Sequence, residues 1–260
     1  LLVASATCVG SGGKVLHRGR QKPLKTRFRA RIARNPDATL PMLPDRHLDL
    51  GCGKFPRNPY HRTSLAGVDV RPLQGDERFD YRIANLAVQP IPFDDDHFGS
   101  VSAFDFIEHV PRLLPTADGQ GTAFPFIRLM DEVWRVLAPG GRFYALTPAF
   151  PHPEAFIDPT HVNIIAAGTH AYFCGESPMA RMYGFKGRFH ALRAEAVHLT
   201  EHYAANADDP ANRAAPRHRG LKGFARAFRG WSRRLRGKSV HGDRKPYLLW
   251  ELEAIKPARD

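Results

Sequence analysis

A glycine turn directly after a short buried run is the feature that most constrains the fold. His47-Leu48-Asp49-Leu50 has the pattern of a buried strand, which Gly51 ends and Gly53 follows. Because glycine has no Cβ, the backbone of such a turn can approach a ligand closely. A second strand-like run, residues 65–70, contains Asp69. Asp69 lies 20 residues after Asp49. At this spacing, the carboxylate of Asp69 can accept hydrogen bonds from both hydroxyls of a ribose. The pattern predicts a nucleotide-type ligand at the carboxyl ends of parallel strands.

Two kinds of ligand suit this turn, a dinucleotide and S-adenosylmethionine. A dinucleotide site needs the spacing G-x-G-x-x-G, but Phe55 and Pro56 follow Gly53. A regular helix is also not expected to begin directly after the turn, so no helix N-terminus would present its backbone amides to a pyrophosphate. Asp49, just before the glycines, instead suits a ligand that carries a cationic amino group.

The rest of the chain alternates between strand and helix patterns. Apolar residues recur with helical spacing over 124–137, and Pro139, Gly140 and Gly141 end that pattern. We expect an α/β fold with a mostly parallel sheet, helices on both faces and a C-terminal antiparallel hairpin. The further strands are predicted at residues 98–106, 142–147, 189–203 and 247–255.

Four stretches in the same order resemble class I S-adenosylmethionine-dependent methyltransferases of the type 11 kind. They are DLGCG (49–53), GVDV (67–70), and residues 90–110 and 132–148. The resemblance implies a Rossmann-like methyltransferase fold and S-adenosyl-L-methionine as the cofactor. One departure is that Phe55 replaces the usual third glycine. The resemblance implies these cofactor contacts: Asp49, Gly51 and Gly53 at the methionine part, Asp69 at the ribose, Asn85 and Leu86 near the adenine, and Asp105 lining the pocket.

A hydroxyl acceptor would need a base to take its proton. The first candidates are Glu108 and His109, which follow a predicted strand. The loop 152–163 supplies a second pair, because Asp158 could orient His161 as the base. The pair could also do no more than brace the loop. A metal site formed by His152, Asp158 and His161 is a weaker alternative, and we assign none.

Residues 148–165 resemble methyltransferases associated with surface-polysaccharide and glycan biosynthesis. This resemblance implies methyl transfer to a hydroxyl of a glycan or small metabolite. Two alternatives stay open: an RNA methyltransferase that uses the basic segments, and a non-catalytic S-adenosylmethionine-binding module.

The net charge of +12 is concentrated in two segments. Residues 1–35 carry nine Lys or Arg and no acid, and residues 205–245 carry twelve against three Asp. We therefore predict a basic arm and linker over 1–45, and a methyltransferase domain over 46–260 with a basic insertion at 205–245. Within that insertion, 219–238 has the pattern of a cationic amphipathic helix. It could contact an anionic membrane surface, bind nucleic acid or pack on the domain.

The cysteines Cys8, Cys52 and Cys174 are widely spaced and form no CxxC pair, so neither a zinc knuckle nor a disulfide framework is expected. The sequence has no apolar run of about 18 residues and no signal-peptide pattern. These features predict a cytoplasmic protein that contacts the inner membrane at most peripherally.

Overall fold

The computed structural model describes residues 42–73, 78–203 and 245–257 of the 260-residue chain. The described residues belong to one compact unit, Pro41–Asp260. Most of the predicted basic arm, nearly all of the basic insertion and the whole predicted helix at 219–238 lie outside them.

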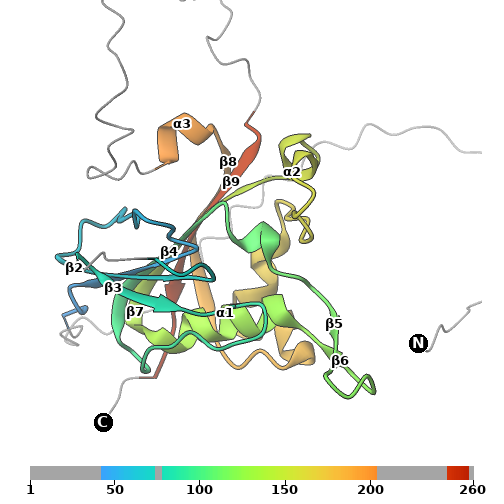
Figure 1. The fold of residues 1–260 in the computed structure, drawn as a ribbon, viewed down its shortest axis with the longest axis horizontal. Coiled ribbons are helices and arrows are strands. Elements are labelled where there is room, and N and C mark those ends of the chain that lie inside the picture. The colour runs from blue at the N-terminus through green and yellow to red at the C-terminus, as the bar shows by residue number, and fades with distance from the viewer. Residues whose placement is uncertain (1–41, 74–77, 204–244, 258–260) are drawn as a thin grey trace, which may run out of the picture. The chain divides into compact units, whose positions relative to one another are not determined.

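A seven-stranded sheet forms the centre of the unit (Figure 1). Counted across the sheet, five neighbouring strands are parallel, the sixth runs antiparallel to the fifth, and the seventh runs antiparallel to the sixth. This confirms the predicted mostly parallel sheet with a C-terminal antiparallel hairpin. The strands in sheet order are β3 (Asp80–Ile83), β2 (Ser64–Asp69), β1 (Arg46–Leu50), β4 (Phe98–Phe104), β7 (Leu137–Pro148), β9 (Tyr247–Ala254) and β8 (Phe189–Val197).

Two strands differ from the sequence prediction. The β3 strand had no predicted counterpart, because it is only four residues long and its alternation of polar residues with Tyr81 and Ile83 is mostly exposed. The predicted strand 189–203 ends at Val197, and residues Leu199–His202 form the one-turn helix α3. Apart from one long helix described below, the remaining described elements are short. They are the hairpin β5 (Leu114–Pro115) and β6 (Thr122–Ala123), α2 (Glu154–Ile157), and the 3-10 turns Ile107–His109, Thr169–Phe173 and Met179–Tyr183.

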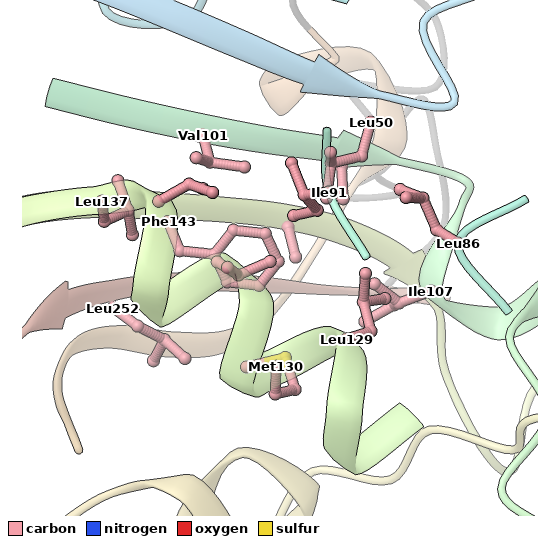
Figure 2. Close-up of a cluster of buried hydrophobic side chains, with 14 of the residues drawn as sticks. Leu50, Leu86, Ile91, Val101, Ile107, Leu129, Met130, Leu137, Phe143 and Leu252 are labelled. Atoms are coloured by element: carbon pink, nitrogen blue, oxygen red, sulfur yellow. The ribbon is translucent and has the colours of Figure 1, made fainter. Parts of the chain in front are cut away.

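The main core lies between one face of the sheet and helix α1 (Pro125–Val136), as Figure 2 shows. Proline fits at the first helical position because its missing N–H would have no intrahelical partner there. Leu129 and Met130 of α1 belong to the same buried cluster as Val101 and Phe143 of the strands, and all four are at most 1% exposed. Burial of this stripe fixes α1 across the strands, as its spacing predicted.

The opposite face is covered differently. Helices were predicted on both faces, but on this face the described residues provide only the one-turn α3 and the loop 51–63. The Arg57 guanidinium of that loop lies 4.2 Å from the Tyr203 ring centroid and 5.3 Å from that of Phe104. Pro56 and Pro59 restrict the loop, and its Arg57 packs where a helix would otherwise cover the strands.

Within the described residues, no helix has the length and apolar character needed to cross a membrane.

Candidate active site

The glycine turn after β1 requires the absence of side chains. Gly51 and Gly53 have φ angles of +67° and +55°, a region that L-residues rarely adopt. A Cβ on Gly51 would lie only 2.6 Å from a ring carbon of Phe106. The turn is fixed to β2 by the Gly51 amide, which donates to the Val68 carbonyl at 2.8 Å. The backbone therefore passes close to the carboxyl ends of β1, β2 and β4.

Asp49 lies behind this turn and is 1% exposed. One of its carboxylate oxygens accepts from the Ser102 hydroxyl at 2.6 Å, and the other accepts from the Arg57 amide at 2.8 Å. Since Ser102 donates to Asp49, it accepts from Nε2 of the buried His47 at 2.9 Å. Burial raises the pKa of Asp49 to about 7 and lowers that of His47 to about 3. Asp49 therefore holds the loop that carries Arg57 against the sheet.

Asp69 ends β2 and reaches back to the turn. It accepts from the Gly53 amide at 2.9 Å and from Arg71 through the backbone amide, Nε and Nη2 at 2.9–3.1 Å. Burial alone would raise the pKa of Asp69, but the hydrogen bonds from Arg71 outweigh it, and the pKa lies below its ordinary value. The Arg71 side chain is 69% exposed. It can therefore leave the carboxylate without disturbing the packed core.

A cavity of about 540 Å³ opens at this edge of the sheet. Six of the sequence-predicted site residues line it, and they come from four separate segments of the chain. The predicted residues in its wall are Gly51, Asp69, Asn85, Leu86, Asp105 and His109. Asp49 and Gly53 do not line the cavity, although the Gly53 amide donates to the lining residue Asp69. Five of the seven residues predicted to contact the cofactor therefore lie around one space.

Asp105 directly follows β4 and has a φ angle of 47°. This left-handed conformation is uncommon for residues other than glycine, asparagine and aspartate, and it often marks functional sites. Its Oδ1 atom is buried and has no hydrogen-bond partner in the described part of the chain. Burial raises the pKa of Asp105, and the hydroxyls of Tyr203 and Tyr247 partly offset that rise.

Beyond Asp105, the turn Ile107–His109 meets the loop after β7. The amides of Val162 and Asn163 both donate to the Glu108 carbonyl, at 3.0 and 2.9 Å. Asn163, which is 1% exposed, also donates from Nδ2 to the Ile107 carbonyl at 3.0 Å. These bonds bring His161 next to His109, and the two ring centroids lie 4.8 Å apart. Asn163 was not predicted from the sequence, because its partners belong to a distant segment of the chain.

The partners of the two histidines differ from the prediction. The Asp158 carboxylate accepts from the Thr160 hydroxyl at 2.6 Å, whereas His161 Nδ1 faces the Ala155 carbonyl at 3.3 Å. Asp158 therefore does not orient His161, as the sequence suggested. Thr160 Oγ1 instead contacts His109 Nδ1 at 2.9 Å, so the carboxylate orients His109 through Thr160. The Asp158-Pro159 turn signal could have revealed this, because the Thr160 amide also donates to Asp158, at 2.8 Å.

Glu108 completes the group and is 1% exposed. Its Oε2 atom accepts from the Thr147 hydroxyl at 2.9 Å, and its Oε1 atom is buried without a hydrogen-bond partner in the described residues. Burial, with the charge of Asp105, raises the pKa of Glu108 to about 8. One ligand atom each from Glu108, His109 and His161 lie within 4.8 Å of one another. We call these three residues the EHH cluster; His152, part of the alternative metal set, lies outside it.

No model of a known protein family matches the chain, and no curated protein sequence matches it either. Solved structures do match. A methyltransferase from Haloferax volcanii, solved with its methyltransferase activator, is 16% identical, with 82% of this chain and 83% of that chain covered and a TM-score of 0.44. An S-adenosylmethionine-dependent methyltransferase from Mesorhizobium loti is 15% identical, with 80% and 90% covered and a TM-score of 0.42.

A third match is phosphoethanolamine N-methyltransferase 2 from Haemonchus contortus, bound to S-adenosyl-L-methionine. It is 14% identical, with 82% of this chain and 49% of that chain covered and a TM-score of 0.36. The fold assignment rests on the strand order and directions of the chain itself, which form a Rossmann-like sheet with a C-terminal antiparallel hairpin.

Proposed function

We propose that the chain transfers a methyl group from S-adenosyl-L-methionine to a hydroxyl oxygen of a glycan or small metabolite. The single observation that carries this proposal is the shared cavity wall. Gly51, Asp69 and Asp105 line the same 540 Å³ space as His109 of the EHH cluster. His109, whose imidazole can accept a proton, therefore borders the proposed cofactor pocket.

Three features of the chain fit this cofactor. The cavity volume lies within the roughly 300–1,000 Å³ of small-molecule sites. A side chain on Gly51 would fill the space beside Phe106 and block close approach of a ligand to the turn. The buried Oδ1 of Asp105 lacks a partner among the described residues, which suits an incoming hydrogen-bond donor or cationic ammonium group.

The residues divide by the part of the cofactor they would hold. Asp69 would accept from the ribose hydroxyls once Arg71 moves aside. Asn85 and Leu86 would flank the adenine, and Asp105 would face the methionine part. When bound, the cofactor supplies a methyl group on a positively charged sulfur, so catalysis depends mainly on positioning and on the acceptor's proton.

The EHH cluster favours a hydroxyl acceptor. A neutral hydroxyl is a weak nucleophile until its proton is lost. His109 of the cluster lines the cavity, Glu108 and His161 lie next to His109, and Thr160 contacts Nδ1 of the His109 ring. Its role in the proposed reaction is to promote loss of that proton. The glycan class is supported by the resemblance of residues 148–165 alone.

Calorimetric titration with S-adenosylhomocysteine tests the cofactor part. Asp69→Asn keeps the shape of the side chain but removes the charge, so affinity should fall about ten-fold or more, since a hydrogen bond to a charged group contributes roughly 1.5–3 kcal/mol. Asp80→Asn on the exposed strand β3 is the control and should leave the affinity unchanged. Absence of binding, or equal binding by both variants, contradicts the proposal.

A transfer assay with methyl-labelled cofactor then tests the acceptor. Sugar nucleotides, lipid-linked glycans, small hydroxylated metabolites and RNA would be compared side by side. Label on the oxygen of a glycan or small metabolite is the expected result. Label confined to RNA would replace this acceptor with the nucleic-acid alternative, and cofactor binding without transfer to any of them would indicate a binding module.

A further inference from the structure

The EHH cluster has features that loss of a hydroxyl proton alone does not require. Three potential ligand atoms, two imidazole nitrogens and one carboxylate oxygen, lie within 4.8 Å of one another. They come from two segments that are far apart in the sequence, the turn after β4 and the loop after β7. Backbone hydrogen bonds from Val162 and Asn163 to Glu108 hold those segments together, so the juxtaposition does not depend on flexible side chains alone.

His109 and His161 each have one ring nitrogen in contact with a neighbouring oxygen. Thr160 Oγ1 donates its only proton to Asp158, so it must accept from Nδ1 of His109. His161 Nδ1 lies 3.3 Å from the Ala155 carbonyl, which can only accept. In these tautomers each histidine keeps a lone pair on Nε2. Metal-binding histidines commonly show this arrangement, in which a second neighbour holds the other ring nitrogen.

The carboxylate of the cluster supplies a second, independent observation. Glu108 is only 1% exposed, and its Oε1 lacks a hydrogen-bond partner in the described residues. A buried acidic group with an unpartnered oxygen is costly unless a cation or a hydrogen-bond donor satisfies that oxygen. A cation bound at the cluster would satisfy it.

We infer that Glu108, His109 and His161 bind a divalent transition-metal ion at the edge of the cofactor cavity. Two imidazoles and one carboxylate suit first-row ions such as Zn²⁺ or Mn²⁺ and leave coordination positions open. Bonds of roughly 2.0–2.2 Å place neighbouring ligand atoms about 3.0–3.5 Å apart, so the side chains close inward by about 1 Å on binding.

The ion gives the proposed reaction a specific acceptor contact, and this part rests on the proposed function. An acceptor hydroxyl that coordinates the ion becomes more acidic, because the cation stabilises the alkoxide. Its proton passes to a solvent water. The oxygen lone pair then forms the bond to the methyl carbon, while the carbon–sulfur bond breaks and its electron pair stays on sulfur. The histidines act as metal ligands in this scheme.

Metal binding is measured first, on the full chain without cofactor. The chain would be stripped with a chelator, dialysed against Zn²⁺ or Mn²⁺, and analysed by elemental mass spectrometry and calorimetry. We expect one ion per chain. His109→Ala and His161→Ala should each weaken binding at least ten-fold, and His152→Ala, in the loop after β7 but outside the cluster, should not. Thr160→Val should weaken it about ten-fold by releasing the His109 ring.

Outcomes separate the two proposals. Less than stoichiometric metal, or affinity unchanged in both His109→Ala and His161→Ala, overturns the metal site. Glu108→Gln, which keeps the side-chain volume, covers the case in which an alanine variant does not fold, and it should also weaken binding. A far-ultraviolet circular dichroism melt would check the folding of every variant. Failure of S-adenosylhomocysteine to bind the wild-type chain would instead count against the proposed function and leave the metal result intact.

Discussion

The hydroxyl of Ser102 on β4 donates a 2.6 Å hydrogen bond to the carboxylate of Asp49 on the neighbouring strand β1. The bond belongs to a buried chain that continues through His47 to Ser100. All four residues lie on the face of the sheet opposite α1, at most 1% exposed. This series of hydrogen bonds links the strands to the loop that begins at the glycine turn, because the other Asp49 oxygen accepts from the Arg57 amide.

The first prediction concerns the pH dependence of stability at Asp49. Burial raises its pKa from 3.8 to about 7, so the folded chain holds this proton more tightly than the unfolded chain. Its contribution to stability is complete below about pH 4 and is lost as the pH rises through about 7. The free energy of unfolding of Asp49→Asn, measured relative to wild type, should therefore increase by several kcal/mol as the pH rises from 4 to 8, at about 1.4 kcal/mol per pKa unit.

Urea unfolding of wild type and Asp49→Asn at pH 4.5, 6 and 8 would measure this difference. Asp80→Asn serves as a control for the same substitution on the exposed strand β3. A difference between wild type and Asp49→Asn that stays constant over this range would show that Asp49 is ionised throughout.

The second prediction tests the hydrogen-bond chain itself. Ser102→Ala removes the partner of both Asp49 and His47 Nε2 and leaves two buried polar atoms unsatisfied. Each such atom costs about 1–3 kcal/mol, so the midpoint of thermal unfolding should fall by several degrees. Scanning calorimetry would detect the shift. The exposed Ser177→Ala should change stability by less than about 0.5 kcal/mol, and an equal effect of both substitutions would disprove a special role for Ser102.

The third prediction addresses the glycine turn. Gly51→Ala places a Cβ 2.6 Å from the Phe106 ring and forces alanine into a positive φ angle. We expect a loss of about 1–3 kcal/mol in stability and at least a ten-fold loss of S-adenosylhomocysteine affinity. Gly168→Ala is the matched control, since its Cβ would meet nothing within 4 Å and its φ is −92°. Unchanged ligand affinity in Gly51→Ala would remove the turn from the binding site.

The sequence predicted those parts of the fold and site whose determinants are local. The buried strands, the spacing of α1 and the glycine turn each depend on neighbouring residues, so their patterns were sufficient. The exposed edge strand β3 has only four residues, so its polar–apolar alternation was too short to stand out. Leu199 and Tyr203 extended the apolar pattern of β8, but their side chains pack on the sheet from the short α3 segment.

The residues proposed to act on the acceptor could be predicted only in part, because their arrangement depends on contacts between distant segments of the sequence. His109 and His161 are far apart in the sequence, and the bonds of Val162 and Asn163 to Glu108 bring them together. Proximity in sequence favoured an Asp158–His161 pair, yet the side chain of Asp158 turns to the nearby Thr160. Long-range docking of one loop on another decided which histidine the carboxylate orients.

The fourth prediction concerns residues 219–238, which lie outside the described part of the structure. We propose that their cationic amphipathic pattern binds an anionic membrane surface. The intact chain should co-sediment with vesicles that contain anionic lipid and should bind neutral vesicles more weakly. Deletion of residues 215–240 should abolish most of that binding. Equal co-sedimentation of both chains would contradict the membrane proposal, and a deleted chain that no longer folds would be detected by its S-adenosylhomocysteine affinity.

The last prediction returns to Asp69 and its neighbour. Arg71 occupies both oxygens of the carboxylate that the ribose hydroxyls would need. Since the Arg71 side chain is 69% exposed, breaking this ion pair costs at most about 1 kcal/mol. Arg71→Ala should therefore raise S-adenosylhomocysteine affinity about two- to five-fold, as measured by calorimetry. Arg82→Ala, on the exposed strand β3, should have no such effect. A clear fall in affinity for Arg71→Ala would show that the guanidinium contacts the ligand and does not compete with it.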